Sequence, residues 1–386
     1  MILDFVISLF LILFGFYVSK KYKLSNKNIV IARYLWIYHL IFCVYFYFSI
    51  LSQGGSDSNR YWEDAILIKD IDMFLNMFLL KGTAAMIAIN FFPSKVLGLS
   101  YFTGSIMYAF VGYLGILYFF KISIEKISLK VKFLNISLFP FLFFLPNLHF
   151  WTCNVGKDTL LFFCIAIIFY YIDKNKYIIP IIFAVIGFLV RPHIILFIII
   201  AFGFTYLFNA KASIFKKGVL IGVLVGVFII MLPKVLQYTQ IESLNVENYN
   251  KFSEKKIKNL SRSHTGSSVD ISSYPLPLKI FTFLYRPFFF DINGIPAILA
   301  SFENLLLLLL TIKVFKNKPK IIFKNAPLII KSLTIFLIIG TLSFSQILGN
   351  VGIMLRMRNM FLPGMFLFLL WSMAYMKSIN YTQKNN

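Results

Sequence analysis

The chain has few charged residues and very few acidic ones. Of its 386 residues 14% are charged, with 15 Asp and Glu against 38 Lys and Arg. No polar half is left that could form a separate soluble domain, so we expect one integral-membrane domain over residues 1–386. Cysteine is scarce too: Cys43 and Cys164 lie in apolar runs and Cys153 lies near a loop. This pattern suggests neither a disulfide framework nor a metal site.

Familiar nucleotide and metal motifs are missing as well. The sequence contains no Walker A, HExxH, CxxC or GxGxxG pattern. ATP-driven transport and metal hydrolysis of the soluble type lose support, and we expect neither a cofactor nor a bound metal. Residues 2–19 resemble a secretion signal in their apolar character. They lack a basic start and a small-residue cleavage site, so we expect a first spanning helix there.

Apolar residues are what the chain has in abundance, at 59% with 46 Phe and 21 Tyr. A membrane-spanning helix needs about 20 mostly apolar residues. Eleven runs come close to this length, which predicts an all-α, polytopic transmembrane bundle of about 11 spans. The predicted spans are 2–19, 33–52, 101–120, 133–150, 158–173, 177–190, 194–210, 217–236, 295–312, 326–346 and 361–377.

The lysines predict the orientation of this bundle. The net charge is +23, but the lysines fall in short clusters in every second loop. This is typical of cytoplasmic loops beside anionic lipid rather than of a nucleic-acid surface. The N-terminus is then outside and the C-terminus cytoplasmic. Most acidic residues fall in the other loops, which include residues 53–100, with interfacial or re-entrant helices, and the long outer loop 237–294, whose apolar part also suits an interfacial helix.

The first candidate constellation follows the second predicted span. Asp57 and Arg60 stand between a Gly pair and the aromatic residues Tyr61 and Trp62. Asp57 suits a general base for a sugar hydroxyl, or a metal ligand, and Arg60 suits a substrate contact. In the alternative interpretation Asp57 is a helix N-cap and the two aromatic residues are interfacial anchors.

The second constellation lies between two predicted spans and contains His149, Lys157 and Asp158. Burying these groups would be costly, so we expect them to face water or a polar cavity. The alternative is that Lys157 and Asp158 cap the next helix while His149 is interfacial.

Three further Arg motifs follow. Arg191 precedes His193 between two short apolar runs, and an isolated Arg at this depth needs a partner such as an anion, unless it snorkels from a plain turn. Arg286 is followed by Asp291, and Arg356 and Arg358 follow Gly349–Gly352. The planar guanidinium fork suits a diphosphate. The alternative for these motifs is interfacial anchoring.

These motifs together resemble the bacterial polysaccharide polymerases of O-antigen and capsule synthesis, a group of multi-pass membrane glycosyltransferases. The longest outer loop, 237–294, departs from that family because it carries no obvious pair of Arg residues. The pieces that carry the resemblance are Gly55-Ser56-Asp57 to Tyr61, Pro146 to Trp151 with Lys157-Asp158, Arg191-Pro192-His193, Arg286-Pro287-Phe288, and Asn350-Val351-Gly352 to Arg356 and Arg358.

The resemblance implies an enzyme that joins undecaprenyl-diphosphate-linked oligosaccharide repeats at the outer face of the bacterial cytoplasmic membrane. Its partners would be that lipid-linked substrate, membrane lipids, a flippase and a chain-length regulator, and no nucleic acid. By the same resemblance, a His or a carboxylate activates the acceptor and outer Arg residues bind the diphosphate. The base candidates are Asp57, His149 and His193. The substrate-binding candidates are Arg60, Lys157, Asp158, Arg191, Arg286, Arg356 and Arg358.

Two other functions stay open from the sequence. A transferase that adds a single sugar from a polyprenyl-phosphate donor would use Asp57 as base, with or without a divalent metal. A non-enzymatic flippase or transporter of lipid-linked sugars would need polar residues at the membrane midplane and often an internal repeat. Apart from Glu303 we find neither in the sequence.

Overall fold

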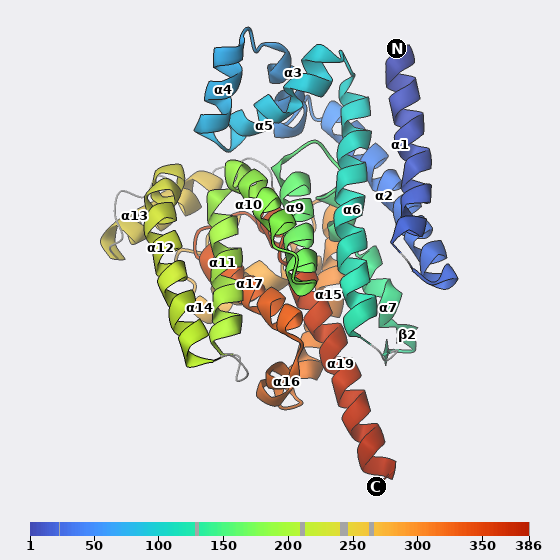
Figure 1. The fold of residues 1–386 in the computed structure, drawn as a ribbon, viewed down its shortest axis with the longest axis vertical. Helices are drawn as coiled ribbons and strands as arrows, with labels where there is room; N and C mark the ends of the chain where they lie inside the picture. Colours follow the sequence, from blue (N-terminus) through green and yellow to red (C-terminus); the bar gives the residue numbers. More distant parts are fainter. Residues whose placement is uncertain (23, 128–130, 209–212, 240–245, 262–265, 386) are drawn as a thin grey trace. The chain divides into compact units, whose positions relative to one another are not determined.

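The computed structural model describes residues 1–22, 24–127, 131–208, 213–239, 246–261 and 266–385 (Figure 1). These residues form helices almost throughout, which confirms the all-α class. The one sheet among them is a two-stranded antiparallel hairpin, in which β1 (Lys132–Phe133) pairs with β2 (Ile136–Ser137).

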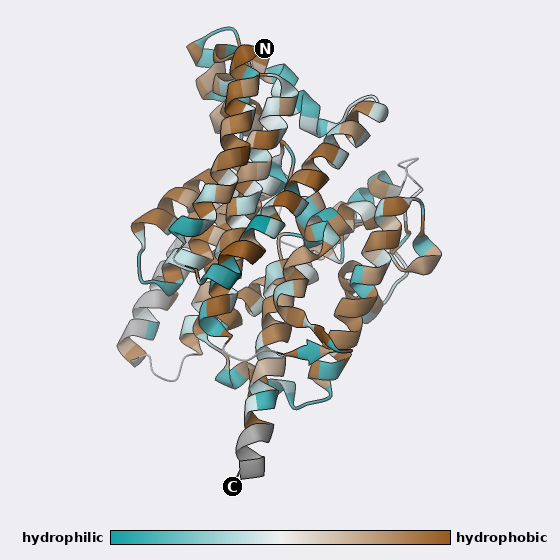
Figure 2. Cartoon of the chain, turned by 90° about the vertical axis from the view of Figure 1, so that its right-hand side faces the viewer, coloured by the Kyte–Doolittle hydropathy of each residue, from teal (hydrophilic) through white to brown (hydrophobic). Residues whose placement is uncertain are grey.

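Five helices of the described part are long and apolar enough to cross a membrane, by length and composition. Figure 2 shows that hydrophobic residues, in brown, make up much of the helical ribbon. We therefore describe the chain as a membrane protein. The five are α1 (Ile2–Lys21), α2 (Asn26–Ser52), α6 (Tyr101–Lys126), α15 (Ile295–Phe315) and α19 (Leu362–Asn385).

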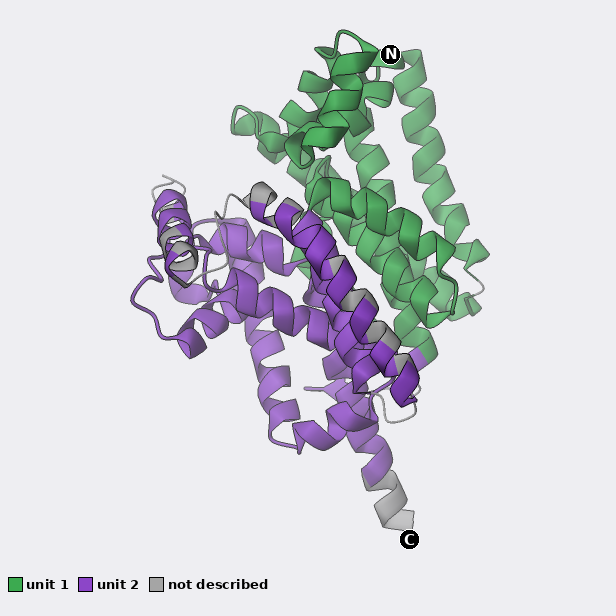
Figure 3. Cartoon of the chain, turned by 60° about the vertical axis from the view of Figure 1, so that its left-hand side comes forward, with its two compact units in different colours: residues 1–125, 139–191 green, residues 126–138, 192–386 purple. Residues whose placement is uncertain are grey.

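The chain divides into two compact units, which we describe separately (Figure 3). Unit 1 comprises residues 1–125 and 139–191, and unit 2 comprises residues 126–138 and 192–386. That residues 1–386 make one membrane domain stays a prediction.

Besides α1, α2 and α6, unit 1 contains a group of short helices whose core is formed by two aromatic residues. Tyr61 and Trp62 are only 3% and 2% exposed, and the Trp62 indole N–H donates to the carbonyl of Leu99 over 2.9 Å. They are thus core residues, which corrects the alternative that they are interfacial anchors. The further helices are α3 (Asp57–Ile66), α4 (Ile71–Leu80), α5 (Thr83–Phe91), η1 (Phe92–Val96), α9 (Lys157–Asp173) and α10 (Ile178–Val190).

In unit 2, α17 packs against both α11 and α19. The contact with α19 is close because of Gly364, where a Cβ atom would lie 2.5 Å from the carbonyl oxygen of Leu333. Besides α15 and α19, the helices are α11 (Pro192–Leu207), α12 (Ile214–Thr239), α13 (Val246–Ser261), α14 (Leu276–Tyr285), η3 (Phe289–Asp291), α16 (Pro319–Asn325), α17 (Leu328–Phe344) and α18 (Val351–Arg358).

Residues 133–150 do not form the single spanning helix that their apolar character predicts. After the β1–β2 hairpin, whose turn residues Leu134 and Asn135 have φ values of 49° and 64°, the chain forms three short helical pieces. Pro140 and Pro146 lack an N–H and interrupt any continuous helix. The pieces are α7 (Leu138–Phe141), η2 (Leu142–Phe144) and α8 (Pro146–Phe150).

The two predicted outer loops contain helices. Residues 53–100 hold α3, α4, α5 and η1. In residues 237–294 the described part holds the end of α12, then α13, α14 and η3, while 240–245 and 262–265 lie outside the described residues. That these helices lie at the membrane interface stays a prediction.

Candidate functional site

Asp57 and Arg60 both project from α3 into solvent. The N-cap of this helix is Ser56, whose side chain accepts a hydrogen bond from the Ser58 N–H over 3.1 Å. Asn59 completes a capping box by accepting from the Ser56 N–H over 2.6 Å. Asp57 is therefore not the cap, which corrects the alternative interpretation. Its carboxylate lies in the first turn, is exposed, and is open to a substrate.

Asp158 and Arg191, predicted as members of two separate motifs, form one buried ion pair in unit 1. The guanidinium Nη1 lies 2.9 Å from the carboxylate Oδ1, and the side chains are only 7% and 6% exposed. Asp158 stands in the first turn of α9, and Arg191 follows the last residue of α10. The anion that we expected beside Arg191 is thus a carboxylate of the same chain. Two buried charges are tolerated because each compensates the other.

Lys157 lies beside this ion pair in sequence and links α9 to α5. Its ammonium donates to the Thr83 hydroxyl over 2.8 Å and lies 5.5 Å from the ring centre of Tyr61. The side chain is half-buried rather than open to solvent. In unit 1 the structure therefore brings Arg191 into contact with Asp158, and Lys157 is the residue next to Asp158 in the chain.

His149 is fully buried, contrary to the expectation that it faces water or a polar cavity. A 2.9 Å hydrogen bond joins its Nδ1 to the Nδ1 of His39 on α2, and its Nε2 lies 2.8 Å from the carbonyl oxygen of Phe143. Because a carbonyl only accepts, neutral His149 carries its proton on Nε2 and accepts from His39 at Nδ1. Its only basic lone pair is occupied, so this geometry disfavours His149 as the acceptor base.

In unit 2, Arg286 follows the end of α14 and is engaged by Asp291 in a two-point ion pair. Its Nε donates to Asp291 Oδ2 over 2.9 Å, and its Nη2 donates to Oδ1. Asp291 Oδ2 also accepts the Phe288 N–H over 2.9 Å. The guanidinium carbon lies 5.6 Å from the ring centre of Phe290. The side chain of Arg286 keeps 15% exposure.

This pairing changes the proton affinity of both partners. Burial alone would raise the pKa of Asp291, but the hydrogen bonds from Arg286 and from the Phe288 N–H, with the Arg286 charge, outweigh it and lower the pKa. The hydrogen bond to Asp291 raises the pKa of Arg286. Both groups are therefore charged at neutral pH.

Arg358 is fully buried and its donors are directed at its own chain. Nη1 donates to the carbonyls of Leu284 and, over 3.4 Å, of Phe283, while Nη2 donates to Asn304 Oδ1 over 2.5 Å. Asn304 in turn donates to the carbonyl of Pro287 over 2.8 Å. Helices leave their last carbonyls without partners, and Arg358 satisfies those of α14. Burial lowers the pKa of Arg358 to about 10, so it stays protonated at neutral pH.

This geometry disfavours Arg358 as a direct diphosphate contact and favours a role in holding the Arg286 turn. Its Nη1 also lies 3.5 Å from the carbonyl oxygen of Arg286 itself. We call the two buried side chains Arg358 and Asn304 the turn bracket, because together they reach the carbonyls on both sides of this turn.

His193 joins the same region through aromatic contacts. It is half-buried at the start of α11, with its ring centre 5.9 Å from that of Phe344 and 6.0 Å from that of Phe197. Phe344 stacks on Phe283 at 6.3 Å, and the Phe283 carbonyl is one of the acceptors of Arg358. The unit 2 residues His193, Arg286 and Arg358 thus belong to one connected cluster.

Arg356 is half-buried on α18, two residues before Arg358. Asn350 caps this helix by accepting from the Ile353 N–H over 3.1 Å, and the Ser267 hydroxyl donates to the same Asn350 oxygen. The Val351 N–H donates to the Ser267 carbonyl over 2.9 Å. The outer-loop segment that contains Ser267 is therefore held against the helix that carries Arg356.

The structure also contains contacts that sequence reasoning missed. Asp291 follows Arg286 by five residues, and this short spacing is the local signal from which their pairing could have been predicted. No local signal indicates the other two partners. His39 lies 110 residues from His149, and Asn304 lies 54 residues from Arg358. Such pairings depend on tertiary packing.

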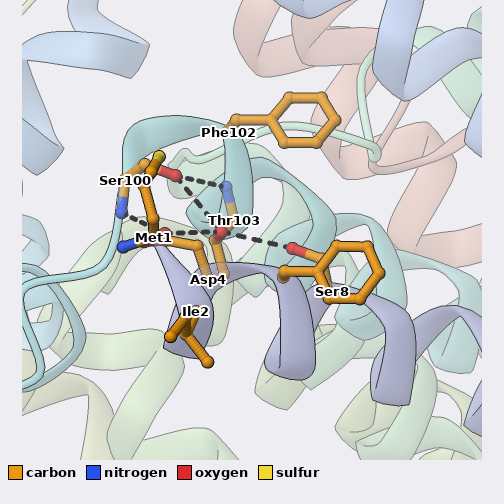
Figure 4. Close-up of a pocket in the computed structure, with 8 residues that line it drawn as sticks. Met1, Ile2, Asp4, Ser8, Ser100, Phe102 and Thr103 are labelled. Carbon is orange, nitrogen blue, oxygen red and sulfur yellow. Dashed lines mark hydrogen bonds and ion pairs between the residues drawn. The ribbon is translucent and has the colours of Figure 1, made fainter.

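An open pocket of unit 1 lies between α1 and the start of α6 and includes none of the predicted site residues (Figure 4). Its polar part is Asp4, which accepts hydrogen bonds from the Ser100 N–H over 2.7 Å and from the Thr103 hydroxyl over 2.8 Å. These bonds join α1 to the start of α6, where the Ser100 hydroxyl accepts from the Thr103 N–H over 3.3 Å, so we assign the polar groups a structural role.

No protein-family model, curated protein or solved structure matches this chain.

Proposed function

We propose that the chain is a glycosyltransferase of the polymerase type. It would join undecaprenyl-diphosphate-linked oligosaccharide repeats into O-antigen or capsule at the outer face of the bacterial cytoplasmic membrane. The observation that carries the proposal is Arg286, a partly exposed guanidinium between the apolar helices α14 and α15, held from behind by the turn bracket. Asp291 engages the Nε and Nη2 edge of this guanidinium, so we assign the diphosphate oxygens to its other edge, which carries Nη1; guanidinium groups are well suited to such oxygens.

In the proposed reaction a hydroxyl of the acceptor sugar attacks the anomeric carbon of the donor. The bond from that carbon to the diphosphate oxygen breaks, and undecaprenyl diphosphate leaves. Arg286, with Arg356 as second candidate, stabilises the charge on the leaving group, and losing such a group typically costs about 10²–10³ in rate. A base accepts the hydroxyl proton, which is worth roughly 10²–10⁴.

Two base candidates remain after the geometry of His149 is taken into account. Asp57 has an exposed carboxylate on α3 of unit 1, and His193 has a half-buried imidazole at the start of α11 in unit 2. We propose His193 as the base of the polymerase, because it belongs to the same unit 2 cluster as Arg286 and Arg358.

The exposed carboxylate of Asp57 supports the second candidate function. A transferase that moves one sugar from a polyprenyl-phosphate donor needs an accessible base and only one phosphate to bind. The two functions differ in product, because only a polymerase gives a ladder of repeats.

We further propose the orientation with the N-terminus outside, the C-terminus inside, and about eleven membrane-inserted segments, of which 133–150 enters as broken helices. Contacts within unit 1 support it: Lys174, after α9, pairs with Glu125 at the end of α6 over 2.6 Å. The starts of α1 and α6 likewise meet through Asp4 and Ser100. The lysine-rich helix ends therefore share one side, as the preference for cytoplasmic lysine requires.

The test is a deletion of the gene in its host, with the surface polysaccharide resolved on a gel. Strains complemented with wild type, Arg286→Ala, Arg356→Ala and the control Lys279→Ala are compared, since Lys279 is a cation on the same helix as the Arg286 turn. Deletion should remove the long ladder and leave single repeat units, and Arg286→Ala should fail to restore it while still inserting.

Other outcomes of this test point elsewhere. Loss of even the single unit would indicate an earlier transferase or export. An unchanged gel after deletion would remove polymerisation from consideration, and normal ladders with both Arg variants would show that the site assignment is wrong.

A further inference from the structure

Four tyrosines and two lysines gather where the C-terminal ends of α1, α6 and α9 meet in unit 1. The ring centre of Tyr118 lies 5.3 Å from that of Tyr22, 5.0 Å from that of Tyr170 and 5.9 Å from that of Tyr171. We call the following residues the tyrosine–lysine cluster: Tyr22, Tyr118, Tyr170, Tyr171, Lys121 and Lys174. None of them belongs to the site proposed above.

Lys121 is the unusual member of this cluster. Its ammonium lies 5.1 Å from the ring centre of Tyr170 and 5.7 Å from that of Tyr22, and its side chain is half-buried. Within the described part of the chain Lys121 forms no ion pair with a carboxylate. Ring faces attract the charge but leave its three N–H donors without strong acceptors.

Lys174 shows the contrast. It lies 5.5 Å from the ring centre of Tyr170, but its ammonium is 2.6 Å from a carboxylate oxygen of Glu125. Lys174 also lies 4.0 Å from a carboxylate oxygen of Asp173, so both acids are beside Lys174, and among the described residues no ion pair joins either of them to Lys121.

Phenol hydroxyls add donors beside this charge. The Tyr118 and Tyr171 hydroxyl oxygens lie 3.5 Å apart, and the Tyr118 hydroxyl also hydrogen-bonds that of Tyr22. Three hydroxyls in a row use two donors between them, so one of the three O–H donors is left over. An ammonium with adjacent hydroxyls is the donor set that a phosphate oxygen accepts. The apolar bodies of α1 and α6 end at this point, and Tyr and Lys are enriched where helices leave a membrane.

We propose that the tyrosine–lysine cluster binds the phosphate of an anionic phospholipid headgroup at the cytoplasmic edge of the membrane. The competing explanation is structural: Lys121 only neutralises helix C-termini and packs against rings. The two differ in what they require, because only the first makes the stability of the protein depend on the charge of the lipid.

The test measures thermal unfolding of the intact, purified protein in nanodiscs of phosphatidylcholine with increasing phosphatidylglycerol. Wild type is compared with Lys121→Gln, Lys121→Arg and Tyr118→Phe. The matched control is Lys81→Gln, since the Lys81 ammonium also lies 5.1 Å from a ring centre, that of Phe188, but between α4 and α5.

Phosphatidylglycerol should raise the Tm of wild type and of the control alike. For Lys121→Gln the amount of phosphatidylglycerol needed for half of this gain should rise about fivefold, because the variant loses one lysine contact with an anionic surface. Lys121→Arg should retain the gain, and Tyr118→Phe should lose part of it.

Three results would overturn the proposal. The first is an equal phosphatidylglycerol gain for wild type and Lys121→Gln. The second is a Tm loss in Lys121→Gln that is the same in every lipid, which would make Lys121 structural only. The third is the same stabilisation by inorganic phosphate in neutral lipid, which would identify a soluble phosphate rather than a lipid as the ligand.

Discussion

Replacing Arg358 with Met should destabilise unit 2 strongly, because the buried guanidinium is the donor to the fully buried Asn304 and to the carbonyls at the end of α14. Asn304 is fully buried, and its Oδ1 accepts from Arg358 over 2.5 Å. The carbonyl of Leu284 accepts a second close bond, and those of Phe283 and Arg286 accept longer ones. Met fills a similar volume but offers no donor, so these acceptors lose their partner.

The magnitude follows from the two close bonds. Leaving a buried acceptor without a partner costs about 1–3 kcal/mol. Removing the buried charge of Arg358 also removes its desolvation cost, which offsets part of the lost stability. We therefore expect the free energy of unfolding to fall by roughly 2–4 kcal/mol. For a unit of this size that corresponds to a Tm decrease of roughly 5–15 °C.

The assay is thermal unfolding of the purified protein in detergent, followed by intrinsic tryptophan fluorescence. Lys316→Met is the matched control: it removes the same charge from an exposed position after α15, and should change the free energy of unfolding by less than about 0.5 kcal/mol. A Tm for Arg358→Met within about 2 °C of wild type would refute the reasoning. Arg358 would then not be the partner of these carbonyls.

Two further predictions concern ion pairs. Because the pKa of Asp291 is lowered below 3.8 in the folded chain, its pair with Arg286 stabilises the fold above the unfolded-state pKa, and this is lost as the pH falls through the folded-state value. The Tm difference between wild type and Asp291→Asn should therefore be steady near neutral pH and shrink below about pH 4, and a difference that grows on acidification would contradict this. Arg191→Met, which removes the ion-pair partner of the buried Asp158 carboxylate, should cost about 3–5 kcal/mol, and the double variant with Asp158→Leu should cost less. A double variant that is less stable than the single one in the same unfolding assay would show that the pair contributes more than compensation.

Much of the helical architecture was predictable because apolar runs here are bounded by lysine, glycine or proline. The run 158–173 becomes α9 at Lys157–Asp173, and the run 326–346 becomes α17 at Leu328–Phe344. The prediction of one spanning helix over residues 133–150 was wrong for a local reason. The segment is long and apolar enough, but Pro140 and Pro146 prevent one continuous helix.

The candidate site was predictable in residue type but not in pairing. Polar residues in an apolar chain are conspicuous, so Arg191, Arg286 and Arg358 could be chosen from the sequence alone. Their partners could not, because Asp158 and Asn304 meet them only through tertiary packing. The exposure of each Arg side chain was not predictable either, since a buried Arg that binds carbonyls and a partly exposed Arg stand in similar local sequences.

The most direct test of the central claim is reconstitution of the purified protein in liposomes with undecaprenyl-diphosphate-linked repeat units on the outer-face side. Product length and released undecaprenyl diphosphate are measured together for wild type, Arg286→Ala and Lys279→Ala. We expect a ladder of repeats, with an undecaprenyl diphosphate released for each new glycosidic bond, from wild type and Lys279→Ala but not from Arg286→Ala. Translocation of the lipid-linked repeat by wild type without bond formation would contradict the account and identify a transporter instead.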